Sequence, residues 1–175
     1  MNPLLISASL NPDSRSRLLA LEARNVLAAD GQTPAWLDLG ELTLPLCGPA
    51  ESFDHPDVAR AQKMIAAAGA IIAATPIYNY DANAALKNLI ELTGNAWEDK
   101  VVGFLCAAGG ASSYMSILSL ANSLMLDFRC VIVPRFVYAT DEAFANGRIR
   151  DPEISARVAE CARTAVRLAR GWQSA

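Results

Sequence analysis

The sequence predicts a three-layer α/β sandwich, in which helices cover both faces of a five-stranded parallel β-sheet. Short apolar runs alternate with segments whose apolar residues recur every three to four positions, which indicates strands alternating with amphipathic helices. The run from Val101 to Ala107 is almost wholly apolar instead of alternating, which is typical of a parallel strand buried on both faces. Because crossovers between parallel strands are right-handed, a strict alternation of this kind favours helices on both sides of one sheet.

Length and composition predict a single domain over residues 1–175. The chain has 175 residues, of which 53% are hydrophobic and 19% charged, enough for one full core and too few for two typical domains. The net charge of −3 provides no basic field, which argues against nucleic acid and anionic membrane surfaces as partners. No apolar stretch approaches the roughly 20 residues of a membrane-spanning helix, and the start lacks the features of a signal peptide. We therefore expect a cytoplasmic protein.

The first half of the chain reads as a β-α-β unit followed by a long loop and a second helix. Leu4 to Ile6 is an apolar strand, Arg15 to Ala29 has apolar residues on one helical stripe, and Ala35 to Leu39 is a second strand. A loop over residues 40–55 then leads to a helix that opens at Pro56, because proline at the first helical position needs no amide partner.

The second half continues the alternation of strands and helices up to a long terminal helix. Prolines are expected to end the third strand at Pro76 and the fifth at Pro134. The predicted elements are, in order, the strand Ala70 to Ala74, the helix Ala82 to Thr93, the strand Val101 to Ala107, the helix Tyr114 to Phe128, the strand Cys130 to Val133 and the helix Pro152 to about Trp172.

The loop after the first strand has the features of a phosphate-binding loop. Ser9, Ser14 and Ser16 offer hydroxyls, and the start of the following helix offers free amides and a partial positive charge. Arg15 or Arg17 is placed to add positive charge. Serine is also favoured at helix starts without any ligand, so both interpretations stay open at this point.

The loops after the third and fourth strands are suited to a flat ligand. Tyr78, Asn79 and Tyr80 supply ring edges and amides directly after a buried strand. Gly109 and Gly110 allow the backbone to approach a planar molecule, although a tight turn into a helix explains the pair equally well.

The order of the strands brings these three loops together. In the order 2-1-3-4-5, strands one, three and four are neighbours, and ligands of open α/β sheets bind beyond the carboxyl ends of the strands, at the point where the order reverses. The sequence therefore predicts one site built from the three loops.

The whole chain resembles the NADPH-dependent FMN reductase family of flavodoxin-like proteins. The first loop of that family typically reads Gly-Ser-Leu-Arg-x-x-Ser, and its second reads Pro-Glu-Tyr-Asn, followed by Ala-Leu-Lys-Asn. The corresponding segments here are Ala8-Ser-Leu-Asn-Pro-Asp-Ser14, Pro76-Ile-Tyr-Asn79 and Ala85-Leu-Lys-Asn88, and the pair Gly109-Gly110 is also present. The chain departs from the pattern at Ala8, Asn11 and Ile77, and over residues 80–84, where the family has Ser-x-Pro-Gly.

This resemblance implies a flavodoxin-like sandwich with an FMN site in the three loops. The implied cofactor-binding residues are Ser9, Ser14, Arg15 and Ser16 at the phosphate, Pro76, Ile77, Tyr78 and Asn79 at the ring or ribityl chain, and Gly109 and Gly110 at the isoalloxazine. It also implies hydride transfer from NADPH or NADH to FMN and on to a flavin, quinone, azo compound or similar acceptor, with no metal and no side chain as an obligatory acid or base. A homodimer or homotetramer is expected, with the face of the helix bearing Lys87 and Glu91 as a candidate contact.

The remaining reactive residue types are expected to be structural. His55, the single histidine, directly precedes Pro56 and lacks a nearby nucleophile, so a role at the helix entry is favoured over catalysis. The four cysteines lack the spacing of a metal or redox site, and those in apolar segments, Cys106, Cys130 and Cys161, are expected to be buried, unlike Cys47 in its loop.

Two other functions stay open on the same fold. A one-electron carrier of the flavodoxin type would bind FMN without a nicotinamide site, although the modest net charge of −3 argues mildly against it. A flavin-free interaction protein is the second alternative, given the departures at Ala8, Asn11 and Ile77.

Overall fold

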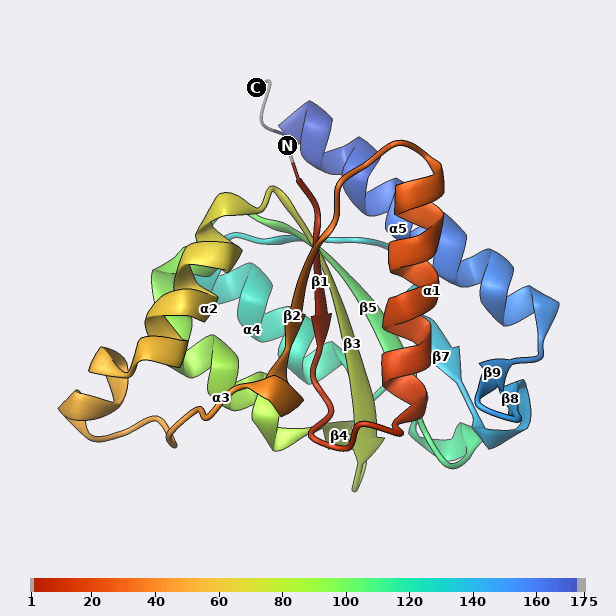
Figure 1. Cartoon of the computed structure of the whole chain (residues 1–175), viewed down its shortest axis with the longest axis horizontal. Coiled ribbons are helices and arrows are strands. Elements are labelled where there is room, and N and C mark those ends of the chain that lie inside the picture. The colour runs from red at the N-terminus through yellow and green to blue at the C-terminus, as the bar shows by residue number, and fades with distance from the viewer. Residues whose placement is uncertain (1, 173–175) are drawn as a thin grey trace.

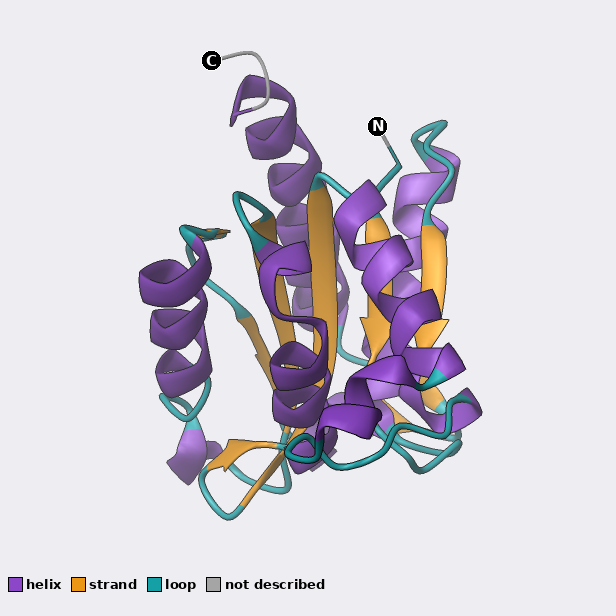
Figure 2. Cartoon of the chain, turned by 90° about the vertical axis from the view of Figure 1, so that its left-hand side faces the viewer, coloured by secondary structure: helices purple, strands orange, loops and turns teal. Residues whose placement is uncertain are grey.

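The structure is a computed structural model that describes residues 2–172, and it shows one parallel sheet between two layers of helices (Figures 1 and 2). The parallel strands follow the order β2-β1-β3-β5-β6, with β7 also paired to β5. The strands are β1 (Leu4–Ser7), β2 (Ala35–Asp38), β3 (Ala70–Tyr78), β4 (Asp81–Ala82), β5 (Val101–Ala107), β6 (Val131–Ile132), β7 (Val137–Ala139), β8 (Phe144–Ala145) and β9 (Arg148–Ile149). This confirms the predicted sandwich, and the predicted order of its five parallel positions.

The helices divide between the two faces of the sheet. They are α1 (Arg15–Ala29), α2 (Pro56–Ala67), α3 (Ala84–Thr93), α4 (Leu118–Phe128) and α5 (Pro152–Trp172). Helices α1 and α5 cover one face, and α2, α3 and α4 cover the other (Figure 1). Because side chains alternate along a strand, Ile71 packs into one layer of core and Ile72 into the opposite layer. None of the helices among residues 2–172 combines the length and apolarity needed to cross a lipid bilayer.

Side-chain caps fix the starts of α1 and α2. Ser14 has an extended backbone, and its hydroxyl accepts a hydrogen bond from the Arg17 amide at 3.2 Å. His55 caps α2 in the same way, since its Nδ1 accepts from the Asp57 amide at 3.2 Å, and Pro56 follows at the first helical position. The predicted role of His55 at a helix entry is thereby confirmed.

Strand β3 continues past Pro76, so the prediction that this proline ends the strand was wrong. The Ala74 carbonyl accepts a hydrogen bond from the Ala8 amide at 2.9 Å, so the backbone groups of Ala74 face β1. Because the direction of these groups repeats every second residue, the backbone nitrogen of Pro76 faces the same side. Strand β1 already ends at Ser7, and the missing amide hydrogen of Pro76 therefore removes no bond of the sheet. The strand extends to Tyr78 and there pairs with the short antiparallel β4.

The fifth position of the sheet is shared by two short strands, a division that the sequence did not predict. Strand β6 pairs with the beginning of β5, and β7 pairs with its end. Between them Arg135 adopts a left-handed backbone with φ of 60°, directly after Pro134, which interrupts the pairing. The strand β6 ends before Pro134, as expected, but the chain returns to the sheet as β7, which we did not predict.

The helix expected from Tyr114 begins four residues later, at Leu118. The Tyr114 ring packs against the rings of Phe136 and Tyr138, with centroid distances of 5.0 and 5.4 Å. The Ser116 hydroxyl donates to the Ser113 carbonyl at 2.6 Å, which favours a turn in this segment. Aromatic packing and a local side-chain bond therefore outweigh the helical spacing of the apolar residues.

Candidate functional site

A pocket of about 370 Å³ lies where the loops after β1, β3 and β5 meet. Its size falls within the range of about 300–1,000 Å³ that is typical of small-molecule sites. It is lined by Asn11, Asp13, Ser14 and Arg15 from the first loop, Pro76, Ile77 and Tyr78 from β3, and Ala107, Ala108 and Gly109 from the end of β5. The three loops singled out from the sequence therefore enclose one cavity at the carboxyl edge of the sheet.

Not every predicted site residue lines this pocket. Six of them line it: Ser14, Arg15, Pro76, Ile77, Tyr78 and Gly109. The other four do not, although Ser16, Asn79 and Gly110 each directly follow a lining residue, and Ser9 stands two positions before Asn11. Ser9 and Ser16 are also buried, with exposed fractions of 2% and 1%. Their hydroxyls therefore face protein atoms more than the open part of the cavity.

Hydrogen bonds between neighbouring side chains shape the first loop. The Ser9 hydroxyl accepts from the Asn11 amide at 3.2 Å, and the Ser14 and Ser16 hydroxyl oxygens lie 3.3 Å apart. As the first residues of α1, Arg15 and Ser16 have no carbonyl one turn earlier in the helix for their amides to bond. The pocket thus has the Ser14 hydroxyl and a helix N-terminus at one end, a combination that suits an anion.

The two arginines near the first loop have different partners. Arg15 lines the pocket and is half-exposed, and its guanidinium lies 2.6 Å from the Asp141 carboxylate. Arg17 instead forms an ion pair with Asp38, whose side chain is completely buried, and its guanidinium stacks 5.8 Å above the centre of the Trp36 ring. Arg15 is therefore the arginine available to a ligand, and Arg17 belongs to the framework.

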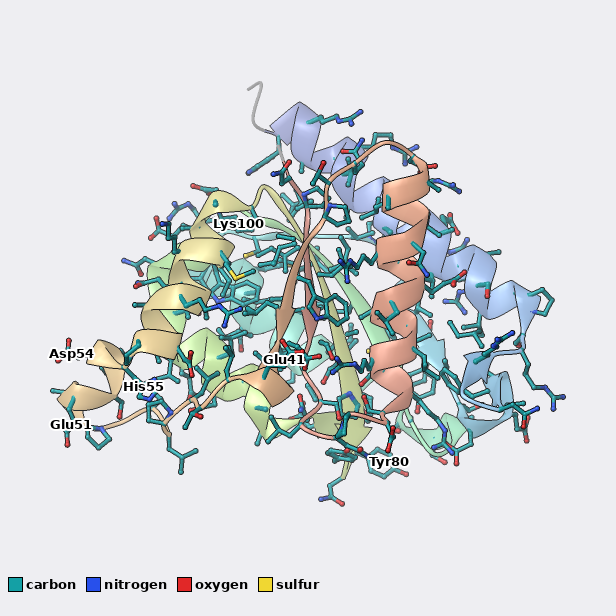
Figure 3. All side chains as sticks on the ribbon, in the orientation of Figure 1. Glu41, Glu51, Asp54, His55, Tyr80 and Lys100 are labelled. Atoms are coloured by element: carbon teal, nitrogen blue, oxygen red, sulfur yellow. The ribbon has the colours of Figure 1, made fainter. Side chains whose placement is uncertain are left out.

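The second loop is a tight hairpin between β3 and β4. Tyr78 pairs with Asp81, and the two residues between them, Asn79 and Tyr80, both have left-handed backbones, with φ of 50° and 65°. This is the geometry of a type I′ turn, which strongly prefers glycine at its second position. The turn places Asn79 at the hairpin tip, directly after Tyr78, which is the last lining residue of β3. Tyr80 is labelled in Figure 3, at the edge of the molecule below the strand ends.

The third loop is held by Tyr138, a residue that the sequence analysis did not select. Gly109 lines the pocket, and a Cβ atom added at Gly109 or Gly110 would meet no atom within 4 Å. The hydroxyl of Tyr138 donates to the Gly110 carbonyl at 2.6 Å and lies 2.7 Å from the Ser113 hydroxyl. A buried tyrosine needs a hydrogen-bond partner for its hydroxyl, and this was the signal in the sequence that could have pointed to Tyr138. The sequence does not reveal that the partner is the Gly110 carbonyl.

Asn83 is the second residue that the sequence analysis missed. It precedes α3, so the helix begins at Ala84 and not at Ala82 as predicted. Its amide nitrogen donates to the Ala8 carbonyl at 2.6 Å, and its amide oxygen accepts from the Thr75 hydroxyl at 3.0 Å. Asparagine before an apolar helical run is a typical N-cap, and that signal was available in the sequence. Its contacts with Ala8, directly after β1, and with Thr75 of β3 required the structure.

The chemical groups around the pocket are suited to binding rather than to nucleophilic or metal chemistry. Within residues 2–172, no cluster of three His, Cys, Asp or Glu side chains is arranged to hold a metal ion. The first loop contributes the Ser14 hydroxyl, the first amides of α1, the Arg15 guanidinium and the Asp13 carboxylate, and Pro76, Ile77 and Tyr78 form a largely apolar wall. This arrangement fits a molecule with an anionic end and a flat body.

Comparisons with known proteins agree with this description. The family model described as NADPH-dependent FMN reductase matches residues 1–145. An NAD(P)H-dependent FAD/FMN reductase of Geobacillus thermodenitrificans is 31% identical over 129 residues, which cover 72% of this chain and 70% of the relative. The NADH-dependent FMN reductase SfnF of Pseudomonas fluorescens is 30% identical over 149 residues, which cover 82% of this chain and 79% of the relative.

Solved structures show the same fold. The apo form of the NADH:FMN oxidoreductase EMOB superposes with a TM-score of 0.77 at 16% identity, over 95% of this chain and 89% of that one. FerB, a flavoenzyme NAD(P)H:(acceptor) oxidoreductase from Paracoccus denitrificans, gives a TM-score of 0.76 at 20% identity, over 97% of both chains.

Proposed function

The chain belongs to the NADPH-dependent FMN reductase family, and on this basis we propose that the loops after β1, β3 and β5 bind FMN. The protein is an NAD(P)H-dependent flavin oxidoreductase, with NADPH or NADH as the electron donor. The observation that carries the proposed site is the single pocket that the three loops enclose. It offers anion-binding groups at one end and a largely apolar wall at the other.

The residues of the pocket suggest how FMN would lie. We assign the phosphate to the start of α1, where the Ser14 hydroxyl and the free helix amides supply neutral donors and Arg15 supplies charge, while the buried Ser16 hydroxyl supports Ser14 from 3.3 Å away. Arginine and hydroxyl donors fit a dianionic phosphate, so the donor set agrees with the cofactor. Ser9 shapes this loop through its bond to the Asn11 amide.

The ring and ribityl chain are assigned to the other two loops. Ile77 is 7% exposed and, with Pro76, provides an apolar wall that excludes water from one side. Gly109 and Gly110 carry no side chain that would block the approach of a planar ring to the backbone. Asn79 contributes through the turn that it forms, which fixes the position of Tyr78 at the pocket.

FMN, when bound, supplies the ring that accepts hydride from the nicotinamide and passes electrons onward. The protein side chains hold the phosphate, orient the ring and limit the access of water. Tyr78 lines the pocket and is 56% exposed, which leaves an aromatic face at its mouth. Such a face favours flat acceptors, and we propose a free flavin, a quinone or an azo compound as the oxidising substrate.

We also propose that residues 1–175 form one FMN-binding domain. The family model ends at residue 145, yet α5 lies beyond it and packs into the same core as α1 and the sheet. Val158, Ala162 and Ala165 of this helix are completely buried there.

A homodimer formed through α3 and α4 is part of the proposed function. Helix α4 exposes Leu118, Met125 and Leu126 on its outer side, with 43%, 44% and 77% of their surface accessible. Beside this ridge lies a groove of about 720 Å³ between α3 and α4, which Lys87, Glu91 and Leu126 help to line. A two-fold interface pairs the same patch of both chains, so the patch has to be self-complementary, and a ridge beside a groove on one face meets this condition. The variant Leu126→Glu should sediment as a monomer if this interface forms, and an unchanged mass would contradict the proposal.

The function is tested by titrating the purified apoprotein with FMN and then adding NADPH or NADH without oxygen. A red-shifted, structured flavin band should appear on binding and should bleach on addition of the preferred donor. Binding without bleaching would indicate a one-electron carrier in place of a reductase. Absence of binding at micromolar FMN would exclude the proposed site.

A further inference from the structure

We propose that Asn83 is a positioning residue that fixes the phosphate-binding loop relative to the ring wall of the flavin pocket. The inference rests on the proposed function, because it concerns how this chain spaces two parts of that site. Asn83 does not line the pocket itself. Its side chain instead contacts Ala8, which precedes the first loop, and Thr75, which precedes the lining residues of β3.

The amide nitrogen of Asn83 ties the first loop in place. It donates to the Ala8 carbonyl at 2.6 Å, across 75 positions of the sequence. Ala8 is completely buried and is followed directly by Ser9, where the phosphate-binding loop begins. The Ala8 amide is already bonded to the Ala74 carbonyl, so the Asn83 bond fixes the other side of the same residue.

The amide oxygen of Asn83 ties the same side chain to β3. It accepts from the Thr75 hydroxyl at 3.0 Å, and Thr75 is completely buried. Pro76 and Ile77 follow directly and form the apolar wall of the pocket. One buried amide therefore touches the residue before the phosphate loop and the residue before the ring wall, and sets the spacing between them.

Capping of α3 alone does not explain this arrangement. The Asn83 oxygen lies 3.4 Å from the Leu86 amide, longer than an ordinary hydrogen bond, whereas the bond to Ala8 is 2.6 Å. The contact with Ala8 is therefore the stronger of the two, and it lies outside the helix that Asn83 precedes.

The physical effect is a gain in preorganisation. A loop that is already held in its binding geometry does not have to be ordered when the ligand arrives, so less of the interaction free energy is lost. Loss of the Asn83 bond would also leave the buried Ala8 carbonyl without this partner. The phosphate contacts depend on the position of the first loop, whereas contacts to the ring depend mainly on β3 and the third loop.

This difference defines the experiment, in which dissociation constants of FMN and riboflavin for the apoprotein are measured by quenching of flavin fluorescence. Riboflavin lacks the phosphate and is therefore the matched ligand. In Asn83→Ser, a serine cap remains for α3 but the bond to Ala8 is lost. We expect FMN affinity to fall about fivefold to tenfold and riboflavin affinity to change less than twofold.

Asn88→Ser is the matched control variant. The Asn88 side chain also ties α3 to a loop, by donating to the Pro45 carbonyl at 2.8 Å and accepting from the Cys47 amide at 2.9 Å. These contacts lie outside the flavin pocket. Asn88→Ser should leave the ratio of the FMN and riboflavin dissociation constants unchanged.

Asn83→Asp provides a second test if the serine variant does not fold. Its carboxyl keeps the shape of the amide, but it donates to Ala8 only while it is protonated. We expect the FMN affinity of this variant, relative to the original protein at the same pH, to fall as pH rises from 5.5 to 9. A purely structural role for the side chain would not produce this pH dependence for FMN alone.

The outcomes separate this inference from the proposed function. Failure of the original protein to bind FMN would overturn the proposed function, and this inference with it. Tight FMN binding by the original protein, combined with an unchanged FMN to riboflavin ratio in both Asn83 variants, would overturn the inference alone. Equal weakening of both ligands would do the same, because it would indicate a general loss of structure.

Discussion

The Tyr138 hydroxyl donates a hydrogen bond of 2.6 Å to the Gly110 carbonyl, so a residue on β7 fixes the loop that leaves the neighbouring strand β5. Tyrosine has one hydroxyl hydrogen, and the Ser113 hydroxyl, 2.7 Å away, must therefore donate to the Tyr138 oxygen. Tyr138 itself is 8% exposed. The loop with Gly109 and Gly110 is therefore held in its conformation by a side chain from another strand, and the two glycines remain accessible to a ligand.

Removal of this hydroxyl should loosen the loop without disturbing the fold. In Tyr138→Phe the ring stays in contact with Tyr114, but the Gly110 carbonyl and the Ser113 hydroxyl lose their buried partner. We expect a stability loss of about 1–2 kcal/mol, with faster amide hydrogen exchange over residues 109–116. Urea unfolding combined with hydrogen exchange measures both effects. Unchanged exchange in this segment would contradict the role of Tyr138.

Arg15 and Arg17 should respond to mutation in opposite ways. Arg17→Ala leaves the buried Asp38 carboxylate without its cation, which should cost about 3 kcal/mol of stability. Arg15→Ala breaks an exposed ion pair, which is worth less than about 1 kcal/mol, but removes the charge assigned to the phosphate. Thermal unfolding should thus single out Arg17→Ala, and FMN titration should single out Arg15→Ala.

A second substitution at Asp38 controls for the buried charge. Asp38→Asn combined with Arg17→Ala removes the unpaired carboxylate and should recover part of the lost stability. The Asp38 oxygen also accepts from the Gly40 amide at 3.0 Å, and asparagine can keep that bond. No recovery in the double variant would show that the ion pair is not the source of the loss.

The sequence predicts the framework of this protein well because its signals are local. Proline at the start of α2 and apolar stripes along α1 and α5 act within their own segments, and these helices begin where expected. The strand order also agrees, because 2-1-3-4-5 is one of the common orders of doubly wound sheets and is the order of flavodoxin-like folds.

The parts that were missed depend on contacts between distant segments. Pro76 continues its strand because β1 ends beside it, and Tyr114 leaves the helix because its ring meets Phe136. Asn83 and Tyr138 bond to carbonyls in other loops, 75 and 28 positions away. Such partners are set by tertiary packing, which overrides local preferences in the sequence.

Gly103 should be intolerant of a side chain because of Cys161. A Cβ atom added at Gly103 in the middle of β5 would lie 2.9 Å from the Cys161 sulfur on α5. We expect Gly103→Ala to lose about 1–3 kcal/mol of stability through overpacking. Adding Cys161→Ala to this variant should restore most of the loss, whereas additive losses in the double variant would contradict the contact.

The buried thiols should make the protein less stable in alkali. Desolvation raises the pKa of Cys130 to about 11 and that of Cys161 to about 12, and it raises the pKa of Cys106 further. Above about pH 9 these thiols ionise in the unfolded chain but stay protonated in the folded one. The folded state then binds more protons, so the free energy of unfolding falls as pH rises from about 9 towards 11.

Each fully protected thiol contributes a slope of about 1.4 kcal/mol per pH unit in this window. Lys100, whose pKa is lowered by desolvation, titrates nearby with the opposite sign, so the informative quantity is the difference between the original protein and Cys161→Ala. Urea midpoints measured from pH 8.5 to 10.5 should fall less steeply in the variant. Identical slopes would mean that Cys161 ionises in the folded protein as readily as in the unfolded chain, contrary to its burial at 3% exposure.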